Sequence, residues 1–134
     1  MNIRLAEKSD EELIKKIHKE SIKEIGSFNL FMSWENYLAN QSPYKFYVID
    51  GMGFMRYGYS KMLKCYTIKE IGVLKEHRGK GVANALVKYT KKPLYLTCNT
   101  DNHSGNGFYK KIGMMHKGSK ASKNGKFRMN IWVM

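Results

Sequence analysis

Cysteine, proline and acidic residues are scarce in this chain of 134 residues. The two cysteines, Cys65 and Cys98, are too few for a disulfide framework and lack the spacing of a zinc site, so neither is expected. No apolar run approaches the roughly 20 residues that span a bilayer, and the first dozen residues contain no apolar leader segment. We therefore expect a cytoplasmic protein that makes no contact with a membrane.

What the chain does contain is typical of a globular protein. Hydrophobic residues make up 43% of it and charged residues 26%, which argues against disorder. The length is that of one domain, and no linker, repeat or low-complexity tract divides it. We expect a single domain over residues 1–134, present as a monomer or a homodimer.

The positive charge is large and unevenly distributed. Lysine and arginine number 24 against 11 acidic residues, a net charge of +13. Residues 1–35 carry a net charge of −1, whereas residues 110–128 contain seven basic side chains and no acidic one. Such a field attracts nucleic acid, an acidic protein or a phosphorylated cofactor, although lysine-rich surfaces also serve solubility alone. Nucleic-acid contact through residues 110–128 is one expectation.

The pattern of apolar residues predicts alternating strands and helices. A capping box at Ser9 and Glu12 predicts the start of a first helix, which Gly26 ends. A second helix over 33–40 is expected to be capped by Ser33. The remaining expected elements are strands at 2–5, 44–49, 53–59, 65–73 and 94–98, helices at 81–89 and 104–112, and a final hairpin of 114–117 with 127–133.

This order of elements predicts the fold class. The connection from the strand at 65–73 to the buried strand at 94–98 passes through a helix and is long enough for a parallel crossover. The other neighbouring strands follow one another closely enough to pair antiparallel. We expect an α/β (α+β) domain with a mixed, mostly antiparallel twisted sheet and helices on both faces.

The most informative segment is the glycine-containing turn that joins the strand at 65–73 to the helix at 81–89. Its sequence, Arg78-Gly79-Lys80-Gly81, opens a helix whose first N–H groups lack internal partners. Glycine lets the backbone approach an anion closely, and His77, Arg78 and Lys80 add donors. The turn therefore suits a pyrophosphate, although an ordinary turn would use the same glycines. It matches neither the P-loop nor the dinucleotide fingerprint.

With a second segment, the turn resembles the GCN5-related N-acetyltransferase (GNAT) superfamily. Arg78, Gly81 and Ala83 match that family's acyl-CoA motif, Q/R-x-x-G-x-G/A. About 20 residues downstream, the family's N-x-x-A-x-x-x-Y-x-x-x-G-F pattern is matched by Asn102, Tyr109 and Gly113.

Two positions depart from the second pattern. Gly105 stands where the family usually has alanine, and Met114 where it has phenylalanine. Both are small or apolar replacements, so they put little of the resemblance in doubt. The resemblance is close over residues 64–117 and rests elsewhere on the order of the elements.

The resemblance implies a GNAT-like acyl-CoA fold and an acyltransferase that uses acetyl-CoA as cosubstrate. It implies that backbone amides near Val73 and Leu74 bind the pantetheine arm, while Asn102 reaches the pantetheine or shapes its loop. Tyr109 would protonate the leaving thiolate, a role open to a tyrosine beside a thiolate of similar basicity. The amides expected to hold the pyrophosphate are those of Gly79, Lys80, Gly81, Val82 and Ala83.

A general base is harder to identify. Glu70 lies on the same strand as Val73 and is the only acidic residue between Asp50 and Glu76. Its carboxylate could accept a proton through water or bind a cationic amine, or it could be an ordinary partner of a nearby lysine. His103 and Cys98 are weaker alternatives.

The acceptor is left open by the sequence. The resemblance places it between residues 27–34, which are aromatic and apolar, and the basic residues 118–127. We expect a primary amine on a small molecule, a protein or a nucleic acid, and the positive field favours an anionic acceptor or carrier. Two alternatives remain: a non-catalytic module with this fold that binds nucleic acid or a partner protein, and an unrelated basic DNA-binding protein.

Overall fold

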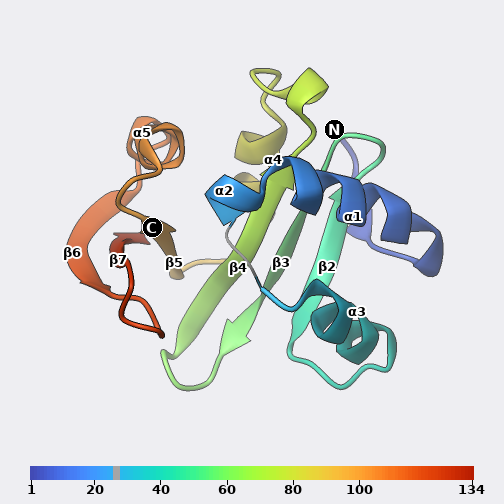
Figure 1. Cartoon of the computed structure of the whole chain (residues 1–134), viewed down its shortest axis with the longest axis horizontal. Coiled ribbons are helices and arrows are strands. Elements are labelled where there is room, and N and C mark those ends of the chain that lie inside the picture. Colours follow the sequence, from blue (N-terminus) through green and yellow to red (C-terminus); the bar gives the residue numbers. More distant parts are fainter. Residues whose placement is uncertain (26–27) are drawn as a thin grey trace.

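The computed structural model describes residues 1–25 and 28–134 (Figure 1). Its helices, with two short 3-10 turns, are η1 (Lys8–Asp10), α1 (Glu11–Glu20), α2 (Ile22–Ile25), α3 (Leu30–Leu38), η2 (Lys75–His77), α4 (Val82–Tyr89) and α5 (His103–Lys111). Its strands are β1 (Ile3–Leu5), β2 (Tyr44–Ile49), β3 (Gly53–Ser60), β4 (Cys65–Val73), β5 (Leu94–Asn99), β6 (Met115–Ala121) and β7 (Arg128–Val133). Within these residues, no helix combines the length and apolarity needed to cross a bilayer.

The seven described strands form one sheet in the order β1-β2-β3-β4-β5-β7-β6. Every neighbouring pair is antiparallel except β4 and β5, which α4 connects and which run parallel. The expected mixed, mostly antiparallel sheet with one crossover is therefore confirmed. The strand expected at 94–98 lies between β4 and β7, as its apolar sequence predicted.

Helices cover both faces of the sheet, because alternate strand residues point to opposite sides. On one face, Phe46 and Val48 of β2 pack with Ile14 and Ile17 of α1, and Trp34 of α3 joins the same cluster. The core of the other face is larger and lies beneath α4. Its members include Met55, Tyr57, Ile68, Val82, Leu86, Val87, Leu94 and Leu96.

The first helix begins differently from the expectation. Asp10, and not Glu12, accepts a hydrogen bond from a preceding backbone N–H, that of Glu7, at 2.7 Å. The reason is tertiary: the guanidinium of Arg4 on β1 holds the same carboxylate at 2.8 and 2.9 Å. The helix is also broken at Ser21, so it becomes α1 and α2. Gly26, its expected end, lies outside the described residues.

The second helix starts earlier than expected. Asn29, and not Ser33, caps α3, since its Oδ1 accepts the N–H of Met32 at 3.0 Å. Ser33 instead lies within the first turn of the helix. Both residue types are good caps, and Asn29 is the one that precedes the first turn of the helix.

The parallel strands β4 and β5 pair over only two residues each. Tyr66 lies opposite Leu94 and Thr67 opposite Tyr95, and beyond them the strands form no further pairs. Figure 1 shows β5 separating from β4 toward the C-terminal ends of both strands. Backbone groups on the facing edges therefore remain free, and the site lies at this opening.

Candidate active site

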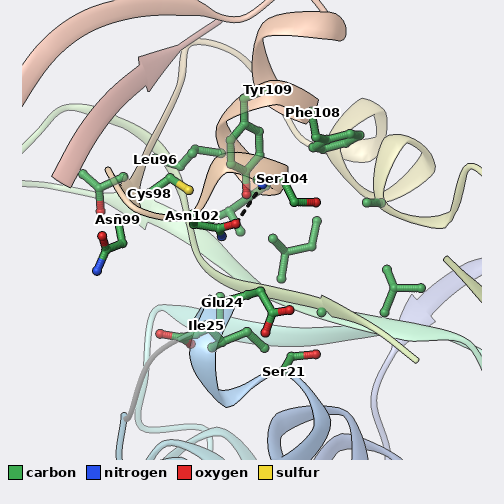
Figure 2. Close-up of a pocket in the computed structure, with 18 of the residues that line it drawn as sticks. Ser21, Glu24, Ile25, Leu96, Cys98, Asn99, Asn102, Ser104, Phe108 and Tyr109 are labelled. Carbon is green, nitrogen blue, oxygen red and sulfur yellow. Dashed lines mark hydrogen bonds between the residues drawn. The ribbon is translucent and has the colours of Figure 1, made fainter. Parts of the chain in front are cut away.

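A large cavity of about 1280 Å³ occupies the opening between β4 and β5 (Figure 2). The two strands form its floor, and α2 lies on the side opposite α5. The turn before α4 forms one end, and the hairpin between β6 and β7 forms part of the rim. Segments that are distant in the sequence therefore meet around one space.

The turn before α4 presents a row of free backbone donors. Gly79 and Gly81 have φ of +79° and +83°, in the left-handed region that favours glycine. The six consecutive N–H groups from Gly79 to Asn84 make no hydrogen bond to any described residue. Gly79, Gly81, Val82, Ala83 and Asn84 line the cavity. The arrangement is that of an anion-binding helix N-terminus.

Two basic side chains of this turn differ in direction from the expectation. Arg78 lines the cavity, and its guanidinium donates to Ser21 Oγ at 2.9 Å and to the Val73 carbonyl at 3.3 Å. Lys80 is exposed, and its Nζ lies 3.4 Å from His77 Nδ1. The donors of this turn that have no partner among the described residues are backbone amides.

The pairing of β4 with β3 turns the backbone amides of Val73 and Leu74 in opposite directions. The Leu74 N–H donates to the Met52 carbonyl at 2.9 Å, and the Leu74 side chain is buried beneath α1. Leu74 therefore cannot donate to pantetheine, which corrects that expectation. Antiparallel pairs alternate in direction, so the amide of Val73 faces away from β3, toward the opening. The amide of Ile71 has the same direction.

Tyr109 lies on α5 with its hydroxyl turned toward the loop of Cys98 and Asn102 (Figure 2). The residue lines the cavity, is 7% exposed and forms no hydrogen bond through its hydroxyl to any described residue. Burial raises the pKa of this hydroxyl above its ordinary value, and the neighbouring Cys98 raises it further. The group is therefore a protonated donor without a partner among residues 1–25 and 28–134. Burial also raises the pKa of the Cys98 thiol, to about 11, which leaves it neutral and a poor base.

Asn102 caps α5, because its Oδ1 accepts the N–H of Gly105 at 2.9 Å (Figure 2). This supports its role in shaping the loop. Glycine at 105 also has a local structural reason. A Cβ there would lie 2.6 Å from Asn102 Nδ2 and 3.1 Å from Cys98 Sγ. Glycine is what allows these two side chains to pack against the first turn.

Asn106 is a structural residue of the site that the sequence analysis missed. Its Nδ2 donates to the carbonyls of Asn99 and Asn102 at 2.9 and 2.8 Å. Its Oδ1 accepts from Asn130 Nδ2 at 3.1 Å and from Trp132 Nε1 at 2.8 Å. One amide thus ties α5 to β5 and β7, using its full hydrogen-bonding capacity. No local pattern indicates this role, because both β7 partners are more than 20 residues away.

Glu70 lines the cavity but is already paired. Its two carboxylate oxygens accept from Arg56 Nε at 2.6 Å and Nη2 at 3.0 Å, and its side chain is 8% exposed. The Arg56 guanidinium also lies 5.5 and 5.7 Å from the ring centres of Phe28 and Tyr44. Glu70 is therefore a fixed negative charge at the cavity wall. His103 is exposed and lies outside the cavity.

The two segments expected at the acceptor behave differently. Of residues 27–34, position 27 lies outside the described residues, and Trp34 is a core residue that donates to Glu11 Oε1 at 2.7 Å. Phe31 and Met32 are exposed and do not line the cavity. The basic hairpin does reach it, through Ser122, Lys123, Asn124, Phe127 and Met129.

A family model described as an acetyltransferase (GNAT) domain matches residues 42–113. A search of the curated proteins finds no match. The matched range contains β2 to α5, and therefore the turn, both facing strands and Tyr109.

Solved structures share the whole fold. The structure of smu.2055 from Streptococcus mutans UA159 has a TM-score of 0.77 at 18% identity, covering 100% of this chain and 98% of its own. Arabidopsis thaliana NAA60 in complex with acetyl-CoA has 0.76 at 17%, covering 99% and 97%. Ribosomal-protein-alanine N-acetyltransferase from Brucella melitensis has 0.72 at 14%, covering 100% and 99%.

Proposed function

Because the chain belongs to the acetyltransferase (GNAT) family, we propose that it transfers the acetyl group of acetyl-CoA to a primary amine that is anionic or carried by an anionic macromolecule. The observation that carries the proposal is the row of six free amides from Gly79 to Asn84, which opens on the cavity between β4 and β5. Acetyl-CoA supplies the acetyl thioester. All other steps fall to residues of this chain.

The backbone binds the cosubstrate. The amides of Gly79, Lys80, Gly81, Val82 and Ala83 hold the pyrophosphate at the N-terminus of α4, where the helix dipole adds positive potential. The free amide of Val73 binds along the pantetheine arm, which lies beside β4 in the place of a missing strand neighbour. A backbone N–H on this edge also stabilises the negative oxygen that develops during acyl transfer.

Tyr109 protonates the leaving thiolate. Its hydroxyl faces the cavity without a partner in the described residues, so it is free to bind the sulfur. Its raised pKa keeps the proton in place at neutral pH. The proton moves only as negative charge develops on the sulfur, which is when a general acid is needed. Asn102 places the tyrosine indirectly, by capping the helix that carries it.

Glu70 attracts and orients the amine. The Glu70 carboxylate accepts two hydrogen bonds from Arg56, which fix its position at the cavity wall. Its remaining lone pairs can accept from an ammonium or from a bridging water. Loss of the amine proton then passes through water, with Glu70 as its electrostatic guide.

The charge around the rim favours an anionic acceptor or carrier. Lys123 lines the cavity, and Lys120 and Lys126 lie on the same hairpin. The β6 strand is exposed along its whole length, so its lysines are open to a large partner. A protein, a small molecule or a nucleic acid with negative charge near the amine fits this rim.

Isothermal titration with acetyl-CoA tests the proposal. We expect binding to the natural protein and none to Gly81→Glu, which places a carboxylate among the phosphate donors. Gly51→Glu is the matched control: Gly51 also has positive φ, at +67°, and open space around its Cβ, so its folding cost is similar. Binding by all three proteins, or by none, would contradict the proposed binding of pyrophosphate by this turn.

Release of CoA in the presence of an amine panel tests catalysis. The panel contains acidic peptides, small-molecule amines and aminated nucleotides. We expect turnover with at least one anionic member. Tight acetyl-CoA binding without turnover of any member would favour the non-catalytic module instead.

A further inference from the structure

The side chain of Arg78 links α2 to the phosphate-binding turn, which is the glycine turn of residues 78–81. Arg78 opens that turn, yet its side chain reaches to the break between α1 and α2. It donates to Ser21 Oγ at 2.9 Å and, more weakly, to Glu24 Oε1 at 3.4 Å. Ser21 is 2% exposed, so the guanidinium is anchored at a buried point.

Two further contacts join the same parts. The backbone N–H of Lys75 donates to Glu20 Oε1 at 3.1 Å. At Gly72, a Cβ would lie 2.6 Å from Ile17 Cγ2 and 2.9 Å from Ile25 Cδ1, so the bare glycine lets both helices rest on β4. The end of α1 and the start of α2 are therefore held from the strand and loop that precede the phosphate-binding turn.

The α2 helix has little stability of its own. It is four residues long, far below the length at which an isolated helix is stable, and none of its residues is buried. The N–H groups of Glu24 and Ile25 both bond to the Ser21 carbonyl. Its order thus depends on what holds Ser21. Such marginal elements are the ones that respond to ligands.

We propose that Arg78 is a positioning residue that couples occupancy of the phosphate-binding turn to the placement of α2, the wall of the cavity opposite Tyr109. This rests on the proposed function, since the ligand of the turn is the pyrophosphate of CoA. An anion on the free amides orders the glycine turn, Arg78 carries that order to Ser21, and the α2 wall becomes fixed. Figure 2 shows Ser21, Glu24 and Ile25 across the cavity from Asn102 and Tyr109.

This coupling has a consequence for the reaction. By thermodynamic reciprocity, an acceptor that contacts α2 tightens CoA binding by the same factor. Because Arg78 acts through Ser21, the effect requires the pair and not the positive charge alone.

Amide hydrogen exchange measured by NMR, at Glu24 and Ile25, tests the coupling. Titration calorimetry first establishes the concentration of CoA that saturates each variant. In the natural protein we expect saturating CoA to slow exchange at both amides by about 10-fold, within the usual range of coupling between sites. The ratio of the exchange rate without CoA to the rate with saturating CoA measures the coupling. In Ser21→Ala and Arg78→Ala we expect this ratio to fall to about 1, whatever their exchange rates without ligand.

Two variants separate positioning from charge and from general structure. Arg78→Lys keeps the charge but cannot reach Ser21 Oγ and the Val73 carbonyl together, so we expect most of the ratio to be lost. Lys80→Ala removes a charge from the same turn, where Lys80 lies only near His77, and should keep the full ratio at saturation. A purely structural Arg78 would instead change exchange equally with and without CoA.

The measurements distinguish a failure of the coupling from a failure of the proposed function. If CoA does not bind the natural protein, the proposed function fails, and the coupling with it. If CoA binds but leaves exchange at Glu24 and Ile25 unchanged, or slows it equally in Ser21→Ala, only the coupling is overturned.

Discussion

Arg56 and Glu70 face each other across β3 and β4 and share two hydrogen bonds, Nε to Oε1 at 2.6 Å and Nη2 to Oε2 at 3.0 Å. Both side chains are largely removed from solvent, at 16% and 8% exposure. The pair therefore brings a carboxylate to the cavity wall in a form that the sheet can tolerate. It fixes the position of the Glu70 carboxylate beside the cavity.

The energetics of this pair can be tested by urea unfolding. We expect Arg56→Met to lower the free energy of unfolding by about 3 kcal/mol, because it leaves the Glu70 carboxylate without a partner. The double variant Arg56→Met with Glu70→Met should be more stable than Arg56→Met alone, since no unpaired charge remains. A double variant less stable than the single one would show that Arg56 matters through packing against Phe28 and Tyr44.

Tyr109→Phe tests the general acid. We expect the turnover rate to fall by about 10²–10⁴-fold, with the dissociation constant of acetyl-CoA nearly unchanged, as measured by CoA release and calorimetry. Since its pKa is raised above 10, the hydroxyl should cause no loss of rate up to pH 10 in the natural protein. Tyr37→Phe, which removes a remote hydroxyl bonded to the Ala6 carbonyl, should keep the rate. Equal rates for Tyr109→Phe and the natural protein would show that Tyr109 serves only in packing.

Gly105→Ala and Gly107→Ala form a matched pair in α5. The first restores the residue that the family usually has, yet we expect it to destabilise the protein by about 1 kcal/mol, because the methyl group displaces the Asn102 cap. Gly107 has open space, so alanine there should stabilise by about 0.4–1 kcal/mol. Thermal unfolding measures both. An equal stabilisation by the two would show that Asn102 moves aside without cost.

Acid stability should depend on Asp10. Its hydrogen bonds with Arg4 lower the pKa of this carboxyl below its ordinary value. The carboxylate therefore contributes stability above the unfolded-state pKa of about 3.9, and the contribution is lost as pH falls through the lower folded-state pKa. Asp10→Asn should make the stability curve flatter between about pH 5 and pH 2. Asp101→Asn, at an exposed position, should leave the slope unchanged.

Salt tests the role of the basic hairpin. Lys120, Lys123 and Lys126 replaced together by alanine should weaken binding of an anionic acceptor and flatten its dependence on salt, without changing acetyl-CoA affinity. With a nucleic-acid acceptor, log affinity should fall linearly with log salt in the natural protein. The control is Lys16, Lys19 and Lys61 replaced together, which removes equal charge from exposed positions elsewhere. Equal effects of the two triple variants would assign the charge to solubility.

Local patterns predicted most of the fold. Strands β2 and β4 begin and end at the predicted residues, because alternating and β-branched side chains at 44–49 and 65–73 suit only a sheet. The turn at Arg78–Gly81 was predicted to leave amides free, since two glycines before a helix impose that backbone. The cap residues were harder to predict: Ser9 and Ser33 are good caps, but Glu7 and Asp10 form the capping box and Asn29 caps α3.

The sequence by itself indicated the family, the positions of most strands and the glycine turn before α4, because motifs, strand preferences and turn glycines depend on neighbours within a few residues. Only the tertiary structure decided what the side chains do. It turned Arg78 toward Ser21, paired Glu70 with Arg56, bonded the Leu74 amide to Met52 and made Asn106 the link between α5 and β7. Each of these contacts joins residues that are far apart along the chain or lie opposite each other on neighbouring strands. A long polar side chain has several partners within reach, and the one it meets is set by how helices and strands pack.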